Sequence, residues 1–184
     1  MKAKSQLIEM TVTTADGEFI ARYSGQGLAE LDFPKVGRET QRPVTDRRHG
    51  GESQNSALRA PPHRRLQDKI RGWHRVTADA LKLVLGGRKP KTLPPLDMKG
   101  TMFQKCVWNA LKKITPGKTR SYGEIARVIG RPKAVRAVGS ACGANPVPVL
   151  VPCHRVLSAG KALGGFSGGL DWKRALLRRE GIKL

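Results

Sequence analysis

Apolar and polar side chains alternate over the first part of the chain, which is the pattern of β-strands with one buried face. Two such runs flank Asp16-Gly17, a dipeptide that is typical of tight hairpin turns. A third apolar group ends at Pro34. The pattern therefore predicts three short strands within residues 5–34, and helical spacing then predicts a helix over residues 66–85 that ends at Gly86-Gly87.

Residues 35–65 interrupt this pattern, because they are rich in Arg, Pro, Gln, Ser and Gly and nearly free of large apolar side chains. Such a composition cannot bury enough apolar surface to fold by itself, so we expect a mobile insertion there. Residues 89–97 contain three prolines and indicate an extended linker. We therefore expect an N-terminal α/β domain over residues 1–95 and a C-terminal domain over residues 96–184.

Helical spacing dominates the second half. Capping boxes at Thr101-Met102-Phe103-Gln104 and at Ser121-Tyr122-Gly123-Glu124 each predict the start of a helix. The second helix is expected to end at Gly130, and Pro132 precedes a third one with an apolar stripe of Val135, Val138 and Cys142. These two short helices predict a helix-turn-helix.

The remaining segments are predicted from turn residues and spacing. Residues 147–151 are expected to be extended, because they follow Asn145-Pro146 and are rich in valine. A last helix is predicted over residues 171–179, with Gly181 after its end.

The chain is strongly basic, with 35 Lys and Arg against 14 Asp and Glu and a formal net charge of +21. Residues 99–184 hold 17 basic and 3 acidic side chains (net +14), whereas residues 1–98 hold 18 and 11 (net +7). A field of this sign favours a polyanion such as DNA, RNA or an acidic membrane surface. A basic surface that only solvates the protein is the alternative. Because most of the excess charge lies in the C-terminal part, we expect a binding surface there.

The three cysteines, Cys106, Cys142 and Cys153, show no Cys-x-x-Cys spacing, and the four histidines show no metal-ligand spacing. We therefore expect no disulfide framework, no structural zinc site and a reducing compartment. No apolar leader or membrane-spanning run stands out. The expected location is intracellular and cytoplasmic, or nuclear in a eukaryote. Cys106 and Cys142 are expected to be core residues of their helices.

Two short segments of the C-terminal part carry candidate chemistry. In Pro152-Cys153-His154-Arg155 a base and a cation follow a cysteine, and such neighbours lower the pKa of a thiol and make it a nucleophile. A buried structural cysteine is the alternative. The helix expected near residues 133–141 is rich in small side chains, with Arg136 as the one long side chain after Ala134. It suits insertion into a DNA groove or, equally, close packing on a neighbouring helix.

From Phe103 onward, the motifs resemble in order and spacing the C-terminal domain of the O6-alkylguanine-DNA alkyltransferases (methylated-DNA–protein-cysteine methyltransferases). The matching segments are FQKCVW (103–108), SYGEIA (121–126), RPKAVRAVG (131–139), GANPVPVLVPCHRV (143–156), GGFSGGL (164–170) and KRALLRREG (173–181). The resemblance implies an α/β N-terminal domain that is ribonuclease-H-like, with a small antiparallel sheet and a helix. It implies a mainly helical C-terminal domain with a winged helix-turn-helix that binds DNA.

The resemblance also implies a catalytic group of four residues. Cys153 would be the alkyl acceptor, His154 the base that takes the thiol proton through a water, and Glu180 the carboxylate that orients the histidine. Asn145 would tie the recognition helix to the active-site segment.

Contacts with DNA follow from the same resemblance. Arg136 would fill the stack after the damaged nucleotide has rotated out, and Tyr122 would crowd the phosphate of that nucleotide and donate to the base. The other residues expected on the DNA side, in the minor groove, are Ala134, Ala137, Gly139 and Ser140. The substrate pocket would be formed by Tyr122, Val156, Phe166 and Ser167.

The implied activity is that of a methylated-DNA–[protein]-cysteine S-methyltransferase, which repairs DNA by direct damage reversal. One alkyl group per molecule would move from O6-alkylguanine in double-stranded DNA to Cys153, with O4-alkylthymine as a further candidate substrate. No cofactor and no metal are expected, and the protein is expected to be a monomer, with cooperative binding on DNA left open. A DNA-binding regulator without chemistry and a cysteine hydrolase are the competing functions.

Overall fold

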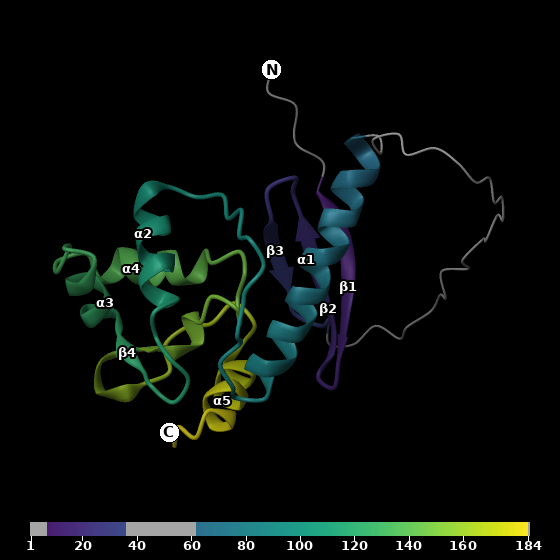
Figure 1. The fold of residues 1–184 in the computed structure, drawn as a ribbon. Coiled ribbons are helices and arrows are strands. Elements are labelled where there is room, and N and C mark those ends of the chain that lie inside the picture. Colours follow the sequence, from purple (N-terminus) through teal and green to yellow (C-terminus); the bar gives the residue numbers. More distant parts are fainter. Residues whose placement is uncertain (1–6, 36–61, 184) are drawn as a thin grey trace, which may run out of the picture.

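The computed structural model describes residues 7–35 and 62–183. In its N-terminal part, β1 (Ile8–Thr14), β2 (Gly17–Tyr23) and β3 (Leu28–Asp32) form an antiparallel sheet in that order. The hairpin predicted from the sequence is present, because β1 and β2 pair up to Thr14 and Gly17, and Gly17 has a φ of +111°. The long helix α1 (Pro62–Leu85) packs along this sheet (Figure 1).

The insertion expected at residues 35–65 lies mostly outside the described residues. Its last four positions, residues 62–65, form the first turn of α1. The helix therefore begins four residues before the predicted start at Leu66. Proline is favoured at the first position of a helix, since its missing N–H has no helical partner there, and Pro62 occupies that position.

The segment predicted as a linker is bound to the edge of the sheet. Leu28 donates its N–H to the carbonyl of Pro95 at 2.7 Å and accepts from the N–H of Asp97 at 2.9 Å, which makes a parallel bridge between Leu28 and Leu96. The hydroxyl of Ser24 donates to the Asp97 carboxylate at 2.7 Å. These bonds satisfy part of the open edge of β3 and fix the place where the C-terminal half begins.

Three helices form the centre of the C-terminal half: α2 (Met102–Leu111), α3 (Tyr122–Val128) and α4 (Val135–Gly143). They pack on one another, and Figure 1 shows them on the side of the molecule away from β1. Both predicted capping boxes are present at the starts of α2 and α3. Gly130 follows α3 with a φ of +71°, as expected for a residue that ends a helix.

The rest of the C-terminal half is made of short elements. β4 (Arg120–Ser121) pairs in parallel with β5 (Val156–Leu157), and two 3₁₀ turns, η1 (Cys153–Arg155) and η2 (Ala159–Lys161), flank β5. The last helix, α5 (Leu170–Arg179), begins one residue before the predicted start. Within the ranges that the structure describes, no helix combines the length and the apolar character needed to cross a membrane.

Long-range polar contacts join the elements around one hydrophobic core. The indole N–H of Trp108 donates to the carbonyl of Ala141 at 2.8 Å, which links α2 to α4. At the end of α5, Arg179 binds the Asp16 carboxylate at 2.6 Å and the carbonyl of Leu85 at 3.2 Å. The hairpin turn, the end of α1 and the end of α5 are thereby held together.

Two residues expected in the core are exposed. Cys106 lies on the outer face of α2, because Val107, Trp108 and Leu111 define the face that is buried. Val135, at the first turn of α4, is 40% exposed, since only the later part of that helix packs against its neighbours.

The sequence predicted an extended segment over residues 147–151, but this prediction is wrong. These residues form consecutive turns. The side chain of Asn145 causes this path: its oxygen accepts from the N–H of Val147 at 3.1 Å and its amide donates to the carbonyl of Val151 at 2.8 Å. Val149, between these two bonds, has a φ of +71°. A left-handed conformation is strained for a β-branched residue, so the contacts around it hold it there.

Candidate functional site

Cys153 stands at the first position of η1, directly after the turn that Asn145 holds. The Asn145 amide donates to Sγ of Cys153 at 3.1 Å as well as to the Val151 carbonyl. One side chain therefore fixes both the path of the turn and the position of the sulfur. Cys153 and His154 are neighbours in the sequence, and in an extended strand their side chains would point to opposite faces. Because η1 is helical, both side chains can be buried.

A cavity of about 470 Å³ leads to Cys153, although the residue is only 4% exposed. Its lining comes from α3, α4, η1, the residue after β5 and the glycine-rich loop over residues 164–169. The lining residues are Tyr122, Gly139, Cys142, Gly143, Cys153, Ser158, Gly164, Gly165, Phe166 and Ser167. Gly164 has a φ of +62°, and a Cβ on it would lie 3.0 Å from the Tyr122 hydroxyl. Glycine is thus needed there both for the backbone conformation and for the close approach of Tyr122.

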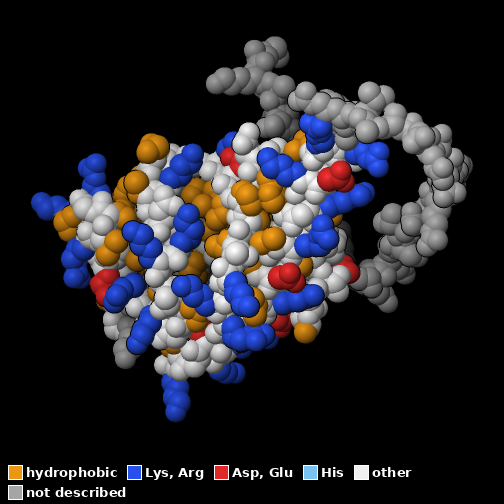
Figure 2. All heavy atoms as spheres, viewed as in Figure 1, with side chains coloured by type: hydrophobic (Ala, Val, Ile, Leu, Met, Phe, Trp, Pro, Cys, Tyr) orange, Lys and Arg blue, Asp and Glu red, His pale blue; other side chains and the backbone are white. Residues whose placement is uncertain are grey.

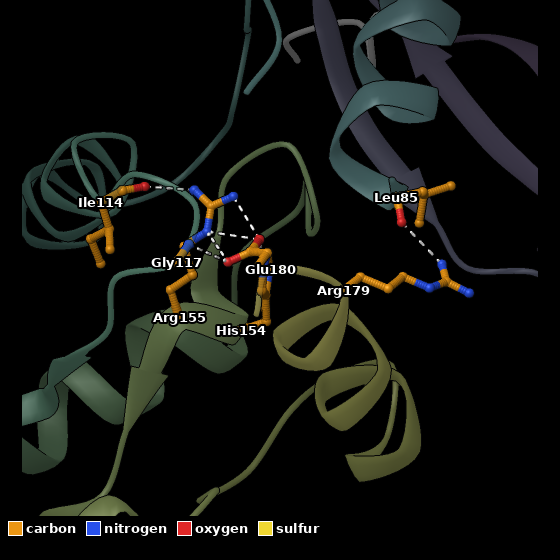
Figure 3. Close-up of polar contacts among 7 residues, drawn as sticks. All are labelled: Leu85, Ile114, Gly117, His154, Arg155, Arg179 and Glu180. Atoms are coloured by element: carbon orange, nitrogen blue, oxygen red, sulfur yellow. Dashed lines mark hydrogen bonds and ion pairs between the residues drawn. The ribbon is translucent and has the colours of Figure 1, made fainter. Parts of the chain in front are cut away.

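Beside the cysteine lies a fully buried histidine–carboxylate pair. Nε2 of His154 is 3.0 Å from Oε1 of Glu180, and both side chains have no exposed area. Arg155 donates to the same carboxylate from Nε at 3.0 Å and from a terminal nitrogen at 2.8 Å, and also to the carbonyl of Ile114 at 2.5 Å. Figure 3 shows Glu180 between these partners, while Arg179 of the same helix points the other way, toward Leu85.

The protonation of this pair follows from its surroundings. Burial lowers the pKa of His154 and outweighs the opposing effect of Glu180, so the imidazole is neutral near pH 7. Burial alone would raise the pKa of Glu180, but the hydrogen bonds from His154 and Arg155 bring it below its usual range. With Nε2–H donating to Glu180, Nδ1 carries a lone pair. It is a buried atom with no hydrogen-bond partner among the described residues.

The neighbours of Cys153 in the sequence predicted a lowered pKa for its thiol. In the structure its pKa is raised instead, so the thiol is not already ionised. Burial raises the pKa of Cys153, and the hydrogen bond from Asn145 and the charge of Lys173 offset this only in part. Burial also raises the pKa of Cys142, to about 12, so the second thiol of the cavity stays protonated. A base is therefore required to activate Cys153, and the free lone pair of His154 can act as one.

The wall of the cavity rests on aromatic side chains from both halves. Phe33, just after β3, contacts Phe166 edge to face with ring centroids 5.6 Å apart, and Trp172 of α5 at 5.1 Å. A Cβ on Gly168 would lie 2.6 Å from the Phe33 ring. Leu31 donates its N–H to the carbonyl of Pro146 at 2.8 Å. The end of the N-terminal sheet thus supports both the cavity wall and the turn before Cys153.

The comparisons with known proteins agree with this geometry. The family profile described as "6-O-methylguanine DNA methyltransferase, DNA binding domain" matches residues 102–182. A methylated-DNA–protein-cysteine methyltransferase of Methanosarcina acetivorans is 60% identical over 82 residues, which are 45% of this chain and 53% of that relative. The chain thus spans about half the length of that relative.

Crystal structures extend the match to the N-terminal half. The O6-methylguanine methyltransferase of Mycobacterium tuberculosis is 33% identical, with a TM-score of 0.68 over 95% of this chain and 93% of that one. The chain belongs to the O6-methylguanine methyltransferase family. The structure of Mycobacterium tuberculosis OGT in complex with DNA is 34% identical, with a TM-score of 0.65, and the match covers 92% of this chain and 90% of that one. Every candidate residue named from the sequence lies within the residues that the structure describes.

The structure brings most of the predicted site residues together. Cys153, His154, Glu180 and Asn145 form one buried group, and Tyr122, Phe166 and Ser167 line the cavity beside it. Val156 is the exception among the pocket residues: it is fully buried in β5 and does not line the cavity. Arg136, Ala137 and Ser140 of α4 are exposed, whereas Gly139 of this helix and Ala134, just before its first residue, are half-buried.

Sequence reasoning missed Lys173, a fully buried cation on α5. Its Nζ donates to the carbonyls of Val156, at 2.7 Å, and of Leu163 and Gly165, so it ties the glycine-rich loop to β5. A signal was present: Lys173 stands on the face of the last helix that Leu176 and Leu177 define as buried. A charged residue on such a face needs several partners.

Proposed function

We propose that this protein removes an alkyl group from O6 of guanine in duplex DNA and retains it on Sγ of Cys153. The observation that carries the proposal is the buried His154–Glu180 pair beside a cysteine that forms the end of a cavity. A protein that only bound DNA would have no use for this arrangement. Membership of the family and the DNA complex of the Mycobacterium tuberculosis relative support the same substrate class.

The first step activates the sulfur. Nδ1 of His154 takes the thiol proton of Cys153 through a water, and Glu180 stabilises the imidazolium that forms. Arg155 keeps Glu180 ionised and in place. The Asn145 amide and the charge of Lys173 favour the thiolate once it has formed.

The second step moves the alkyl group. The thiolate attacks the alkyl carbon in line with the bond to O6, so an S–C bond forms as the C–O bond breaks, and the electron pair of that bond remains on the guanine. The Tyr122 hydroxyl, at the cavity wall, gives a proton to the leaving base and recovers one from the imidazolium through solvent. Nothing in the site reverses the thioether, so each molecule reacts once.

We further propose that α3 and α4 form the helix-turn-helix that holds the duplex. Arg136 on the exposed face of α4 fills the stack when the damaged nucleotide rotates into the cavity. The small side chains of Ala134, Ala137, Gly139 and Ser140 allow the helix to lie close to the minor groove. Extrusion costs a few kcal/mol, which the phosphate contacts of the basic surface offset.

The chain divides, in this proposal, into an N-terminal domain over residues 1–95 and a C-terminal domain over residues 96–184. An antiparallel sheet of three strands with α1 packed on it supports a small ribonuclease-H-like fold for the N-terminal domain. Phe33 and Leu31 give this domain a role in the reaction, because they contact the cavity wall and the turn before Cys153.

Mass measurement after incubation with a duplex that contains O6-methylguanine tests the proposal. Transfer adds about 14 Da to the Cys153 peptide once per molecule. Cys153→Ala should abolish the mass increase and still bind DNA. A DNA-binding regulator would gain no mass and a cysteine hydrolase would turn over repeatedly, so either result would refute the proposal.

The role of Arg136 needs a separate comparison. Arg136→Ala should slow repair in duplex DNA about 100-fold but change the reaction with free O6-benzylguanine little, because the free base needs no extrusion. Arg178→Ala, which removes the same charge from the exposed face of α5, is the matched control and should leave both rates nearly unchanged. Equal losses on the two substrates would contradict a role in base flipping.

A further inference from the structure

A second cavity, of about 350 Å³, lies between the end of α2, the turn before Cys153 and the start of residues 89–97, which are called the interdomain segment below. It shares no lining residue with the cavity that leads to the sulfur. Its lining is formed by Val84, Lys89, Pro90, Lys91, Thr92, Leu93, Lys112, Lys113, Ile114, Thr115, Pro116, Val149, Leu150, Pro152 and Arg155. Of these residues, only Arg155 enters the steps proposed above, where it holds Glu180.

The lining combines two kinds of surface. Aliphatic and proline side chains from α1, the interdomain segment and the turn at Val149 and Leu150 make an apolar floor. Four exposed lysines surround it, Lys89, Lys91, Lys112 and Lys113, and no ion pair joins them to another described residue. No aspartate or glutamate is among the lining residues. Figure 2 shows how densely Lys and Arg side chains gather on this face over α2 and the interdomain segment.

We propose that this cavity binds a nucleotide, with the base on the apolar floor and the phosphates on the lysine rim. A volume of about 350 Å³ lies at the lower end of the range of small-ligand sites, which are mostly apolar with a few polar groups. Lysine is a common phosphate ligand, and four of them create a local field that attracts anions and repels metal cations. A purely inorganic anion would leave the floor unused, and a nucleoside would leave the rim unused.

The cavity also reaches the turn that precedes Cys153. Val149, whose left-handed conformation is described above, is a lining residue. Pro152 and Arg155 border the same cavity, so it lies directly behind the segment that carries Cys153.

Calorimetric titration of the full chain with adenosine triphosphate, inorganic tripolyphosphate and adenosine tests the proposal. Adenosine triphosphate should bind at one site per molecule and more tightly than either of the other probes. Lys112→Ala with Lys113→Ala should weaken its binding about tenfold, because two charge pairs are lost. The matched control is Lys105→Ala with Lys118→Ala, which removes two exposed lysines outside the cavity and should weaken binding less than about twofold.

Each result decides the proposal. Equal losses of affinity in the two double variants would mean that the net charge acts diffusely. Tripolyphosphate that bound as tightly as adenosine triphosphate would mean that the base is not recognised. Either result would overturn the proposal. A short single strand without alkylated guanine separates the sources of the nucleotide: competition with adenosine triphosphate identifies a DNA strand as the occupant, and no competition identifies a free nucleotide. Because no alkyl transfer is measured, the outcome is independent of the proposed repair function.

Discussion

Replacing Glu180 with glutamine tests the buried network while leaving the volume of the side chain nearly unchanged. The carboxylate accepts from Nε2 of His154 and from two nitrogens of Arg155, at 2.8 to 3.0 Å. Glutamine offers one acceptor oxygen and places an NH₂ group where the other oxygen was. Since every neighbour at that point is a donor, the amide would face another N–H, and the buried guanidinium of Arg155 would lose its counter-charge.

The size of the effect follows from these contacts. Removing one partner of a buried ion pair costs about 3 to 5 kcal/mol, and because glutamine keeps one acceptor we expect about 3 kcal/mol lost from the free energy of unfolding. With a urea dependence of about 1 to 3 kcal/mol per molar, the unfolding midpoint should fall by about 1 to 3 M. The rate with free O6-benzylguanine should fall about 100-fold, because His154 loses the group that stabilises its protonated form.

Glu124→Gln is the matched control. Glu124 is also a hydrogen-bonded carboxylate, but it caps α3 at the surface, so its loss should cost no more than about 1 kcal/mol and leave the reaction unchanged. If Glu180→Gln unfolded at the same urea concentration as the unchanged protein, the network would not be a buried ion pair in solution. A normal reaction rate in a destabilised variant would remove Glu180 from the mechanism.

Three further results are expected. Gly168→Ala should slow the reaction with O6-benzylguanine more than that with O6-methylguanine, because a Cβ would push against Phe33 and displace the cavity wall. Competition kinetics with the two bases measure the two rates, and equal slowing would contradict this expectation. Lys173→Met should lower the free energy of unfolding by about 3 kcal/mol, because the buried carbonyl of Val156 and the partly buried carbonyls of Leu163 and Gly165 lose their donor, whereas Lys183→Met should have little effect in the same urea assay. The protein should lose stability as pH falls below 6.5, because burial lowers the pKa of His154 and the unfolded chain therefore takes up the proton first. His154→Asn should reduce this pH dependence of the free energy of unfolding. An unchanged pH dependence in the variant would contradict the expectation.

Features with local determinants could be predicted from the sequence. The two capping boxes and the hairpin depend on residues within three or four positions of one another, and all three are present. The motif around Cys153 and the distant Glu180 could be placed together only through the family resemblance, because 26 positions separate Glu180 from His154. Without it, Glu180 would read as a charged residue at an exposed helix end.

Features set by distant contacts could not be predicted. Helical periodicity alone does not say which of two overlapping faces of α2 is buried; the bond from Trp108 to Ala141 decides it and leaves Cys106 outside. The turns over residues 147–151 depend on one side chain, that of Asn145, rather than on the propensities of the valines. The raised pKa of Cys153 reflects burial, which the adjacent His154 and Arg155 do not reveal.

The close fit of Phe33 against Gly168 constrains how this chain can be recombined with its relatives. These two positions are 135 residues apart in the sequence, yet each limits what the other can be. A chimaera that joins this N-terminal half to another relative's catalytic half should work only when the aromatic residue and the glycine are exchanged as a pair. Directed evolution of new alkyl preferences would therefore gain from libraries that vary both positions together.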